Sequence, residues 1–116
     1  MSEATLYHNP RCSTSRKALE MLRERGIEPT IVEYLKTPPS AEQLQEMAKA
    51  SGQPLRSLVR TKQPEYLEQG LDRSDLSDAQ LAQALHDTPV LIERPILATA
   101  KGVRLGRPVE QILEVL

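Results

Sequence analysis

The chain of 116 residues carries 15 Lys or Arg, 16 Asp or Glu, and 39% hydrophobic residues. This length and balance predict one soluble globular domain, because two full domains would need a longer chain. A net charge of -1, three Tyr and no Trp or Phe argue against a nucleic acid partner, since basic surface and stacking rings are both scarce.

The N-terminus, the short apolar runs and the single cysteine exclude several classes of protein. The apolar runs are shorter than the roughly 20 residues that span a bilayer, and the opening residues 1–5 do not resemble a signal peptide. A lone cysteine, Cys12, excludes an internal disulfide and any multi-cysteine metal site within one chain. We therefore expect a cytoplasmic monomer with no membrane partner and no bound metal.

The first third of the chain predicts a β-loop-α-β unit. Ala4–Tyr7 is short and β-prone, and Pro10 prevents a helix from starting before Cys12. Apolar residues then recur at helical spacing as far as Gly26, and Thr30–Tyr34 is a second β-prone run. A right-handed crossover between parallel strands places Cys12 where the first strand ends and the helix begins.

The middle of the chain, from about residue 40 to residue 88, predicts an all-helical insertion after the second strand. Two capping-box sequences indicate helix starts, namely Ser40 with Gln43 and Ser77 with Gln80. Gly52 suits the end of the first of these helices, and Pro54 suits the first position of another.

The last quarter predicts two antiparallel strands and a final helix. Ile96–Thr99 and Val103–Leu105 flank Lys101 and Gly102, which suit a tight turn. Arg107 and Pro108 are expected to start the final helix. Its core face is expected to carry four residues at helical spacing: Val109, Ile112, Leu113 and Leu116. These elements predict an α/β fold with a mixed sheet flanked by helices.

Cys12 is the most informative residue for chemistry. It precedes a predicted helix, whose N-terminus favours a thiolate, and the cations Arg11 and Arg16 act in the same direction. A free thiol titrates near about 8.5, so this placement predicts a nucleophile at neutral pH. The alternative is a small buried apolar residue, against which its polar neighbours argue.

Longer segments resemble the glutaredoxin- and glutathione-coupled arsenate reductases. These segments occur in the family's order and cover nearly the whole chain: Tyr7–Arg16, Glu33–Pro39, Leu58–Arg60, Ile92–Ile96 and Arg104–Pro108. The resemblance implies one thioredoxin-like domain over residues 1–116 with a helical insertion after the second strand. The element order read from the residues agrees with this implication.

The same resemblance implies roles for individual residues. It implies that Cys12 is the nucleophile and that three arginines surround the oxyanion: Arg60, Arg94 and Arg107. Guanidinium groups suit a tetrahedral oxyanion because they form charge-assisted, often bidentate hydrogen bonds. Pro95 resembles the cis-proline that faces the active-site cysteine in thioredoxin-like folds.

Three neighbours of Cys12 are further candidates for catalysis or binding. His8 either raises the thiolate population as a nearby cation or ends the first strand in solvent. Asn9 and Ser15 are candidates to donate hydrogen bonds to the oxyanion or the thiolate, although both residue types also suit loops and helix caps.

The implied reaction is the reduction of arsenate, or a similar oxyanion, to arsenite. The Cys12 thiolate attacks arsenic, and glutathione reduces the adduct as co-substrate because the sequence has no second cysteine. Glutaredoxin then restores Cys12 from a mixed disulfide. We expect no bound cofactor.

Two alternative functions remain open at this point. One is a regulator of the Spx type, which binds RNA polymerase; the single cysteine and the set of arginines argue against it. The other is a thiol enzyme of the same fold that acts on glutathione adducts. The sequence ends at Leu116, whereas some better-known relatives have a longer C-terminal tail, on which efficient arsenate turnover could depend.

Overall fold

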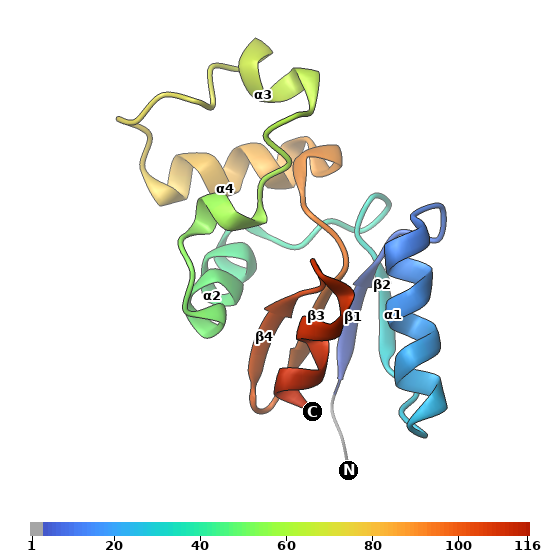
Figure 1. Ribbon diagram of the computed structural model, residues 1–116. Helices are drawn as coiled ribbons and strands as arrows, with labels where there is room; N and C mark the ends of the chain where they lie inside the picture. Colours follow the sequence, from blue (N-terminus) through green and yellow to red (C-terminus); the bar gives the residue numbers. More distant parts are fainter. Residues whose placement is uncertain (1–3) are drawn as a thin grey trace. The chain divides into compact units, whose positions relative to one another are not determined.

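The structure is a computed structural model that describes residues 4–116 (Figure 1). Its elements in chain order are β1 (Thr5–His8), α1 (Ser13–Glu24), β2 (Thr30–Glu33), α2 (Ala41–Ser51), η1 (Leu55–Leu58), α3 (Pro64–Glu68), α4 (Asp78–Asp87), η2 (Pro89–Leu91), β3 (Ile96–Thr99), β4 (Gly102–Leu105) and η3 (Val109–Val115), where η denotes a 3₁₀-helix. They form two compact units: the first comprises the chain up to Thr37 together with Arg94–Leu116, and the second comprises Pro38–Glu93.

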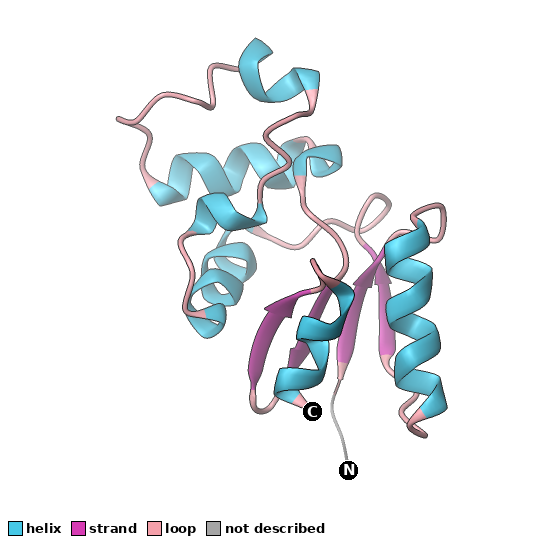
Figure 2. Cartoon of the chain, viewed as in Figure 1, coloured by secondary structure: helices cyan, strands magenta, loops and turns pink. Residues whose placement is uncertain are grey.

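A four-stranded mixed sheet in the order β2-β1-β3-β4 organises the first unit (Figure 2). β1 pairs in parallel with β2, with Leu6 opposite Ile31, and antiparallel with β3, with Leu6 opposite Leu97. The hairpin of β3 and β4 completes the sheet. The predicted β-α-β unit and the predicted antiparallel pair are therefore confirmed, as is the α/β class.

The core of the first unit lies between the sheet, α1 and η3. Leu6 and Leu97 from the sheet, Ala18 and Leu22 from α1, and Ile112 from η3 are fully buried in one cluster. The buried residues of α1 recur every three or four positions, which is the helical spacing that the sequence shows. This packing holds the N-terminal end of α1, and with it Cys12, at the carboxyl end of β1.

Helical segments make up the second unit, which corresponds to the insertion expected at residues 40–88. Both capping boxes are present: the Ser40 and Ser77 hydroxyls each accept a hydrogen bond of 3.1 Å from the backbone N–H three residues later. Gly52 ends α2 in the left-handed region, at φ 73°. The unit extends slightly beyond the expected limits, and an isolated β-bridge joins Val59 to Ile92.

Two expectations about helices are wrong. Pro54 is not the first helical residue; it lies before η1 at ψ 154°, because the proline ring fixes φ and leaves ψ free. The final helix is a 3₁₀-helix, in which residues three apart share a face. Ile112 and Val115 are therefore its buried residues. The other residues expected on the core face are partly buried and pack against the core: Val109, Leu113 and Leu116.

Two smaller features also differ from the expected pattern. The hairpin turn lies at Ala100 and Lys101, so Gly102 is the first residue of β4 rather than part of the turn. The short helix α3 has no residue buried in the core, and it lacks the apolar periodicity from which it could have been predicted. That the two units act as the single domain expected for residues 1–116 stays a prediction.

Candidate active site

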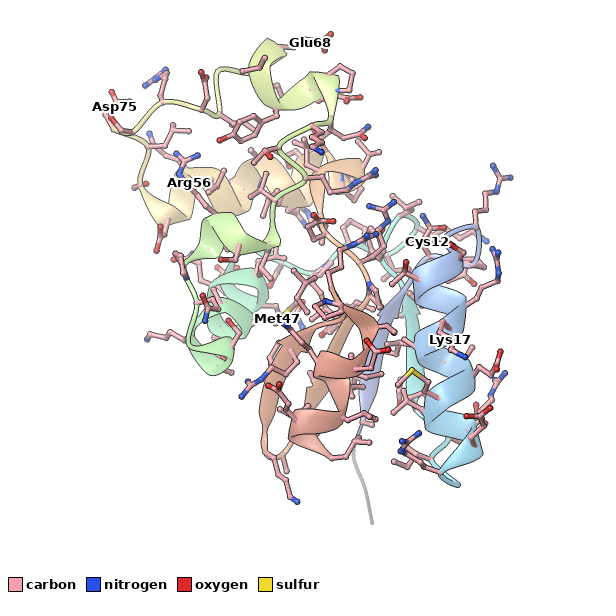
Figure 3. All side chains as sticks on the ribbon, in the orientation of Figure 1. Cys12, Lys17, Met47, Arg56, Glu68 and Asp75 are labelled. Carbon is pink, nitrogen blue, oxygen red and sulfur yellow. The ribbon has the colours of Figure 1, made fainter. Side chains whose placement is uncertain are left out.

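Cys12 occupies the junction between β1 and α1, where it is the N-cap residue of the helix (Figure 3). Its backbone N–H donates to the carbonyl of Asn9 at 3.0 Å, and its carbonyl accepts from the N–H of Arg16 at 2.9 Å. The first bond closes a turn and the second begins the helix. The sulfur is thereby held at the positive end of the helix dipole, with its side chain partly accessible.

Several groups act on the pKa of the Cys12 thiol, and their net effect lowers it. Partial burial raises the pKa, but the backbone N–H of Ser15 and the positive charge of Arg94 oppose it. The N–H of Thr14 and a hydrogen bond from the Arg94 side chain lower the pKa further. The thiolate is favoured because both helix dipole and guanidinium stabilise negative charge on sulfur.

A second arginine reaches the same sulfur. Nη2 of Arg107 donates to Sγ of Cys12 at 3.8 Å, and Nε of Arg107 donates to the carbonyl of Arg94 at 2.9 Å. The Arg94–Pro95 peptide bond is cis, as expected for Pro95, and the Arg107–Pro108 bond is also cis. Arg94 and Arg107, two of the three arginines named from the sequence, therefore lie beside Cys12. Arg107 also holds the backbone of Arg94 through its hydrogen bond to the Arg94 carbonyl.

Gly106 allows this arrangement, and no sequence pattern distinguishes it as a functional residue. A Cβ atom at Gly106 would lie 2.7 Å from Cγ of Pro95 and 3.3 Å from Cγ2 of Ile112. The N–H of Gly106 also donates to the carbonyl of Pro95 at 2.8 Å. The segment that carries Arg107 thus packs directly on the cis-proline, and only the absence of a side chain permits the approach.

His8 and Ser15 form a buried pair beneath the loop. His8 is the last residue of β1 and is 6% exposed, whereas Ser15 is fully buried. Nδ1 of His8 lies 2.6 Å from Oγ of Ser15, which also accepts from the N–H of Asn9 at 3.1 Å. Burial is the main cause that lowers the pKa of His8, so the imidazole is neutral at neutral pH.

Comparisons with known proteins agree with this geometry. Residues 7–115 match the model of the ArsC family. An arsenate reductase of Rhizobium meliloti (strain 1021) is 46% identical over 97% of this chain and 80% of its own length, and an uncharacterized protein of Escherichia coli (strain K12), YfgD, is 46% identical over 97% and 96%. The solved structure of an arsenate reductase from Vibrio cholerae is 42% identical, covers 99% of this chain and 98% of its own, and superposes with a TM-score of 0.95.

The chain belongs to the ArsC family. Its mixed four-stranded sheet flanked by helices is the thioredoxin-like arrangement, with the helical unit inserted after the second strand. No helix among residues 4–116 is both long and apolar enough to cross a membrane. Within the same residues, no group of three or more His, Cys, Asp or Glu side chains is placed to hold a metal ion.

The ArsC-family site corrects two expectations about side chains near Cys12. The cation that lowers the pKa of Cys12 is Arg94, rather than Arg11 or Arg16. Arg16 instead donates to the carbonyl of Pro10 at 2.9 Å and stabilises the loop. Neither interpretation of His8 holds, because the ring is neither cationic at neutral pH nor exposed to solvent.

Asn9 and Ser15 both form hydrogen bonds within the loop and the start of α1. Oδ1 of Asn9 accepts a hydrogen bond of 3.0 Å from the N–H of Arg11, which shapes the loop before Cys12. This bond uses the amide oxygen, so donation by the Asn9 amide to the oxyanion stays a prediction. The Ser15 hydroxyl is bound to His8, so Ser15 acts on the thiol through its backbone N–H. Residue type alone could not distinguish a side-chain role from a backbone role.

Arg60 belongs to the second unit. Its backbone N–H donates to the carbonyl of Leu91 at 2.7 Å, next to the bridge between Val59 and Ile92. This pairing fixes the backbone that carries the guanidinium. The part of Arg60 in oxyanion binding stays a prediction.

Proposed function

We propose that this ArsC-family chain reduces arsenate to arsenite in the cytoplasm, with Cys12 as nucleophile, glutathione as reductant and glutaredoxin as the protein that restores Cys12. The observation that carries the proposal is a thiol of lowered pKa that contacts two arginines at a helix N-terminus. Family membership and similarity over the whole of this chain to a protein named arsenate reductase support the choice of oxyanion. The proposal requires no bound cofactor.

The first step uses the charges around Cys12. An arsenate anion binds to Arg94 and Arg107, whose guanidinium groups can each donate two hydrogen bonds to tetrahedrally arranged oxygens. We assign Arg60 to the same anion. The Cys12 thiolate attacks arsenic; one sulfur–arsenic bond forms, one bond from arsenic to a hydroxyl oxygen breaks, and that hydroxyl takes one proton from solvent and leaves as water.

The second step transfers two electrons to arsenic. The sulfur of glutathione bonds to the sulfur of Cys12, and the electron pair of the sulfur–arsenic bond passes to arsenic. Arsenic falls from As(V) to As(III), the thiol proton goes to an arsenic oxygen, and arsenite leaves. A glutaredoxin thiolate then attacks the glutathione sulfur of the mixed disulfide and releases the Cys12 thiolate.

The two other functions differ from this one in what they require. A regulator that docks on RNA polymerase has no need of a thiol whose pKa is lowered by Arg94. A thiol enzyme for glutathione adducts would use the same thiolate without arsenate. The chain is also similar to YfgD, whose name assigns no activity, so similarity alone does not choose between arsenate and a glutathione adduct as substrate. The assay must therefore distinguish these two substrates.

A coupled assay tests the proposal. Purified protein is incubated with arsenate, glutathione, glutaredoxin, glutathione reductase and NADPH, and the loss of NADPH is followed. We expect arsenate-dependent oxidation of NADPH that stops when either glutathione or glutaredoxin is omitted. Oxidation that proceeds with a glutathione adduct but not with arsenate would favour the alternative thiol enzyme, and no oxidation with either would exclude both.

A further inference from the structure

The first unit has an open cavity of about 450 Å³ beside the N-terminal end of α1. One wall comes from α1, through Ser13, Thr14 and Lys17, and the other from Gly106–Glu110. Small-molecule sites commonly measure about 300–1,000 Å³, so the cavity has the size of one. The steps proposed above assign it no role.

The cavity adjoins the reactive sulfur. Ser13 directly follows Cys12, and Arg107, which lines the cavity, donates to the Cys12 sulfur at 3.8 Å. Cys12 lies directly before α1, and Lys17 lies within α1 (Figure 3). A molecule held between Lys17 and the Gly106–Glu110 segment can therefore present an atom to Cys12.

The charges of the lining specify what kind of molecule fits. Lys17 and Arg107 are cationic, and Glu110 is anionic and exposed. Nζ of Lys17 lies 3.7 Å from an oxygen of Glu20, but both side chains are more than half exposed, so this pair is weak and Lys17 can bind another carboxylate. The lining thus complements a ligand with two carboxylates and one ammonium group.

We propose that this cavity binds the thiol co-substrate, a small peptide with two carboxylates and one ammonium group, which is the chemistry of glutathione. Lys17 binds a carboxylate, Glu110 binds the ammonium group, and the thiol faces Cys12. Because the chain has one cysteine, the second sulfur must come from another molecule, and this cavity is next to the place where it reacts. The identity of the thiol rests on the proposed function.

The test measures how fast Cys12 reacts with two disulfides, one charged and one neutral. The Cys12 thiolate attacks oxidised glutathione, forms a mixed disulfide and releases one glutathione thiolate; bis(2-hydroxyethyl) disulfide is the uncharged reference. The quantity compared is the rate constant for oxidised glutathione divided by the rate constant for bis(2-hydroxyethyl) disulfide. We expect Lys17→Glu to lower this ratio by roughly threefold to tenfold, because the substitution replaces the attraction between an exposed ammonium group and a carboxylate by a repulsion. The control is Arg25→Glu, the same change of charge at the other end of α1, which should leave the ratio unchanged.

Glu110→Lys separates a specific site from general attraction. Glutathione carries a net negative charge, so added positive charge would speed its reaction if only the protein's overall charge mattered. The proposed site predicts the opposite, a lower ratio, because the ammonium group loses its partner. A raised ratio for Glu110→Lys, or an equal effect of Arg25→Glu and Lys17→Glu, would overturn the proposal.

The outcome is independent of the reductase assay, since neither reaction contains arsenate. A chain that reduces arsenate but shows no dependence on Lys17 and Glu110 refutes the cavity alone. A chain that shows the dependence but does not reduce arsenate refutes the proposed substrate and keeps the thiol site.

Discussion

At the scale of single residues, the chemistry depends on what surrounds one sulfur atom. Arg94 acts on Cys12 by charge and by a hydrogen bond, and Arg107 donates to the sulfur at 3.8 Å. Guanidinium groups this close to the thiolate also favour the binding of an oxyanion beside it. The same arginines can therefore prepare the nucleophile and hold the oxyanion that it attacks.

We predict that Arg94→Gln raises the pKa of the Cys12 thiol, because both contributions of the guanidinium are lost. The rate of alkylation by iodoacetamide, measured against pH, should then rise at a higher pH than in the wild type. Arg104→Gln is a matched control, since Arg104 pairs with Glu114 at 2.9 Å. An unshifted profile for Arg94→Gln would contradict the role given to Arg94.

The buried His8 predicts a pH dependence of stability. Burial lowers the pKa of His8 in the folded protein below the value of about 6.5 that an unfolded chain has. The unfolded state therefore binds more protons just below that pH, so stability is fully present above about 6.5 and is lost as the pH falls through the folded-state pKa.

Urea denaturation of the wild type and of His8→Asn at pH values from about 7.5 to about 5 checks this expectation. These limits lie on either side of the ordinary histidine pKa of about 6.5. The wild type should lose more free energy of unfolding on acidification than the variant does. Because His86 is present in both proteins, its contribution cancels in the difference. Equal losses would show that His8 is not the group responsible.

The sequence predicts a residue's position correctly where neighbouring residues along the chain determine it. The position of Cys12 followed from a strand, a proline and a helix, all of which are local signals. The partners of His8 and Ser15 could not be predicted, because their hydrogen bond joins a strand to a helix that only the tertiary fold brings together. Sequence spacing likewise could not show that Arg94, rather than Arg16, stabilises the thiolate.

At the scale of elements, the site depends on two segments that end at the same edge of the sheet. β1 leads into Cys12, and the segment after β4 carries Gly106 and Arg107. Contact between Gly106 and Pro95 sets how closely the second segment approaches. The position of Arg107 beside Cys12 is therefore a property of the packing of both segments.

We predict that Gly106→Ala destabilises the fold by about 1–3 kcal/mol, as overpacking commonly does, because its Cβ would lie 2.7 Å from Pro95. The strain is relieved if the segment moves outward, which takes Arg107 away from the sulfur. Urea denaturation measures the first effect, and the KM for arsenate in the coupled assay measures the second, because Arg107 is proposed to hold that anion. A variant that keeps both wild-type values would show that the contact does not position Arg107.

The elements that could be predicted are those specified by nearby residues. Each capping box acts within four positions, and both are formed. The 3₁₀ form of η3 could not be read from its apolar residues, since Val109, Ile112 and Leu113 suit either helix type. Packing on the sheet and α1 selects Ile112 and Val115 as the buried residues.

At the scale of the whole molecule, the chain separates a sheet unit from an inserted helical unit. The first unit contains Cys12, Arg94 and Arg107, and the second contains Arg60, whose part in oxyanion binding stays a prediction. A net charge of -1 means that attraction of an oxyanion must come from local cations such as Arg94 and Arg107. The order of the elements along the chain and the insertion were predictable because the sequence periodicities and the family resemblance agree.

Arsenite production by the wild type and by Cys12→Ser tests the central claim most directly. Each protein is incubated with arsenate, glutathione and glutaredoxin, and the two arsenic species are separated and quantified. Circular dichroism confirms that the variant is folded. We predict arsenite from the wild type and only the protein-free background from Cys12→Ser, since the hydroxyl has no lowered pKa and cannot form the disulfide. Arsenite from the variant at the wild-type rate would contradict Cys12 as the nucleophile.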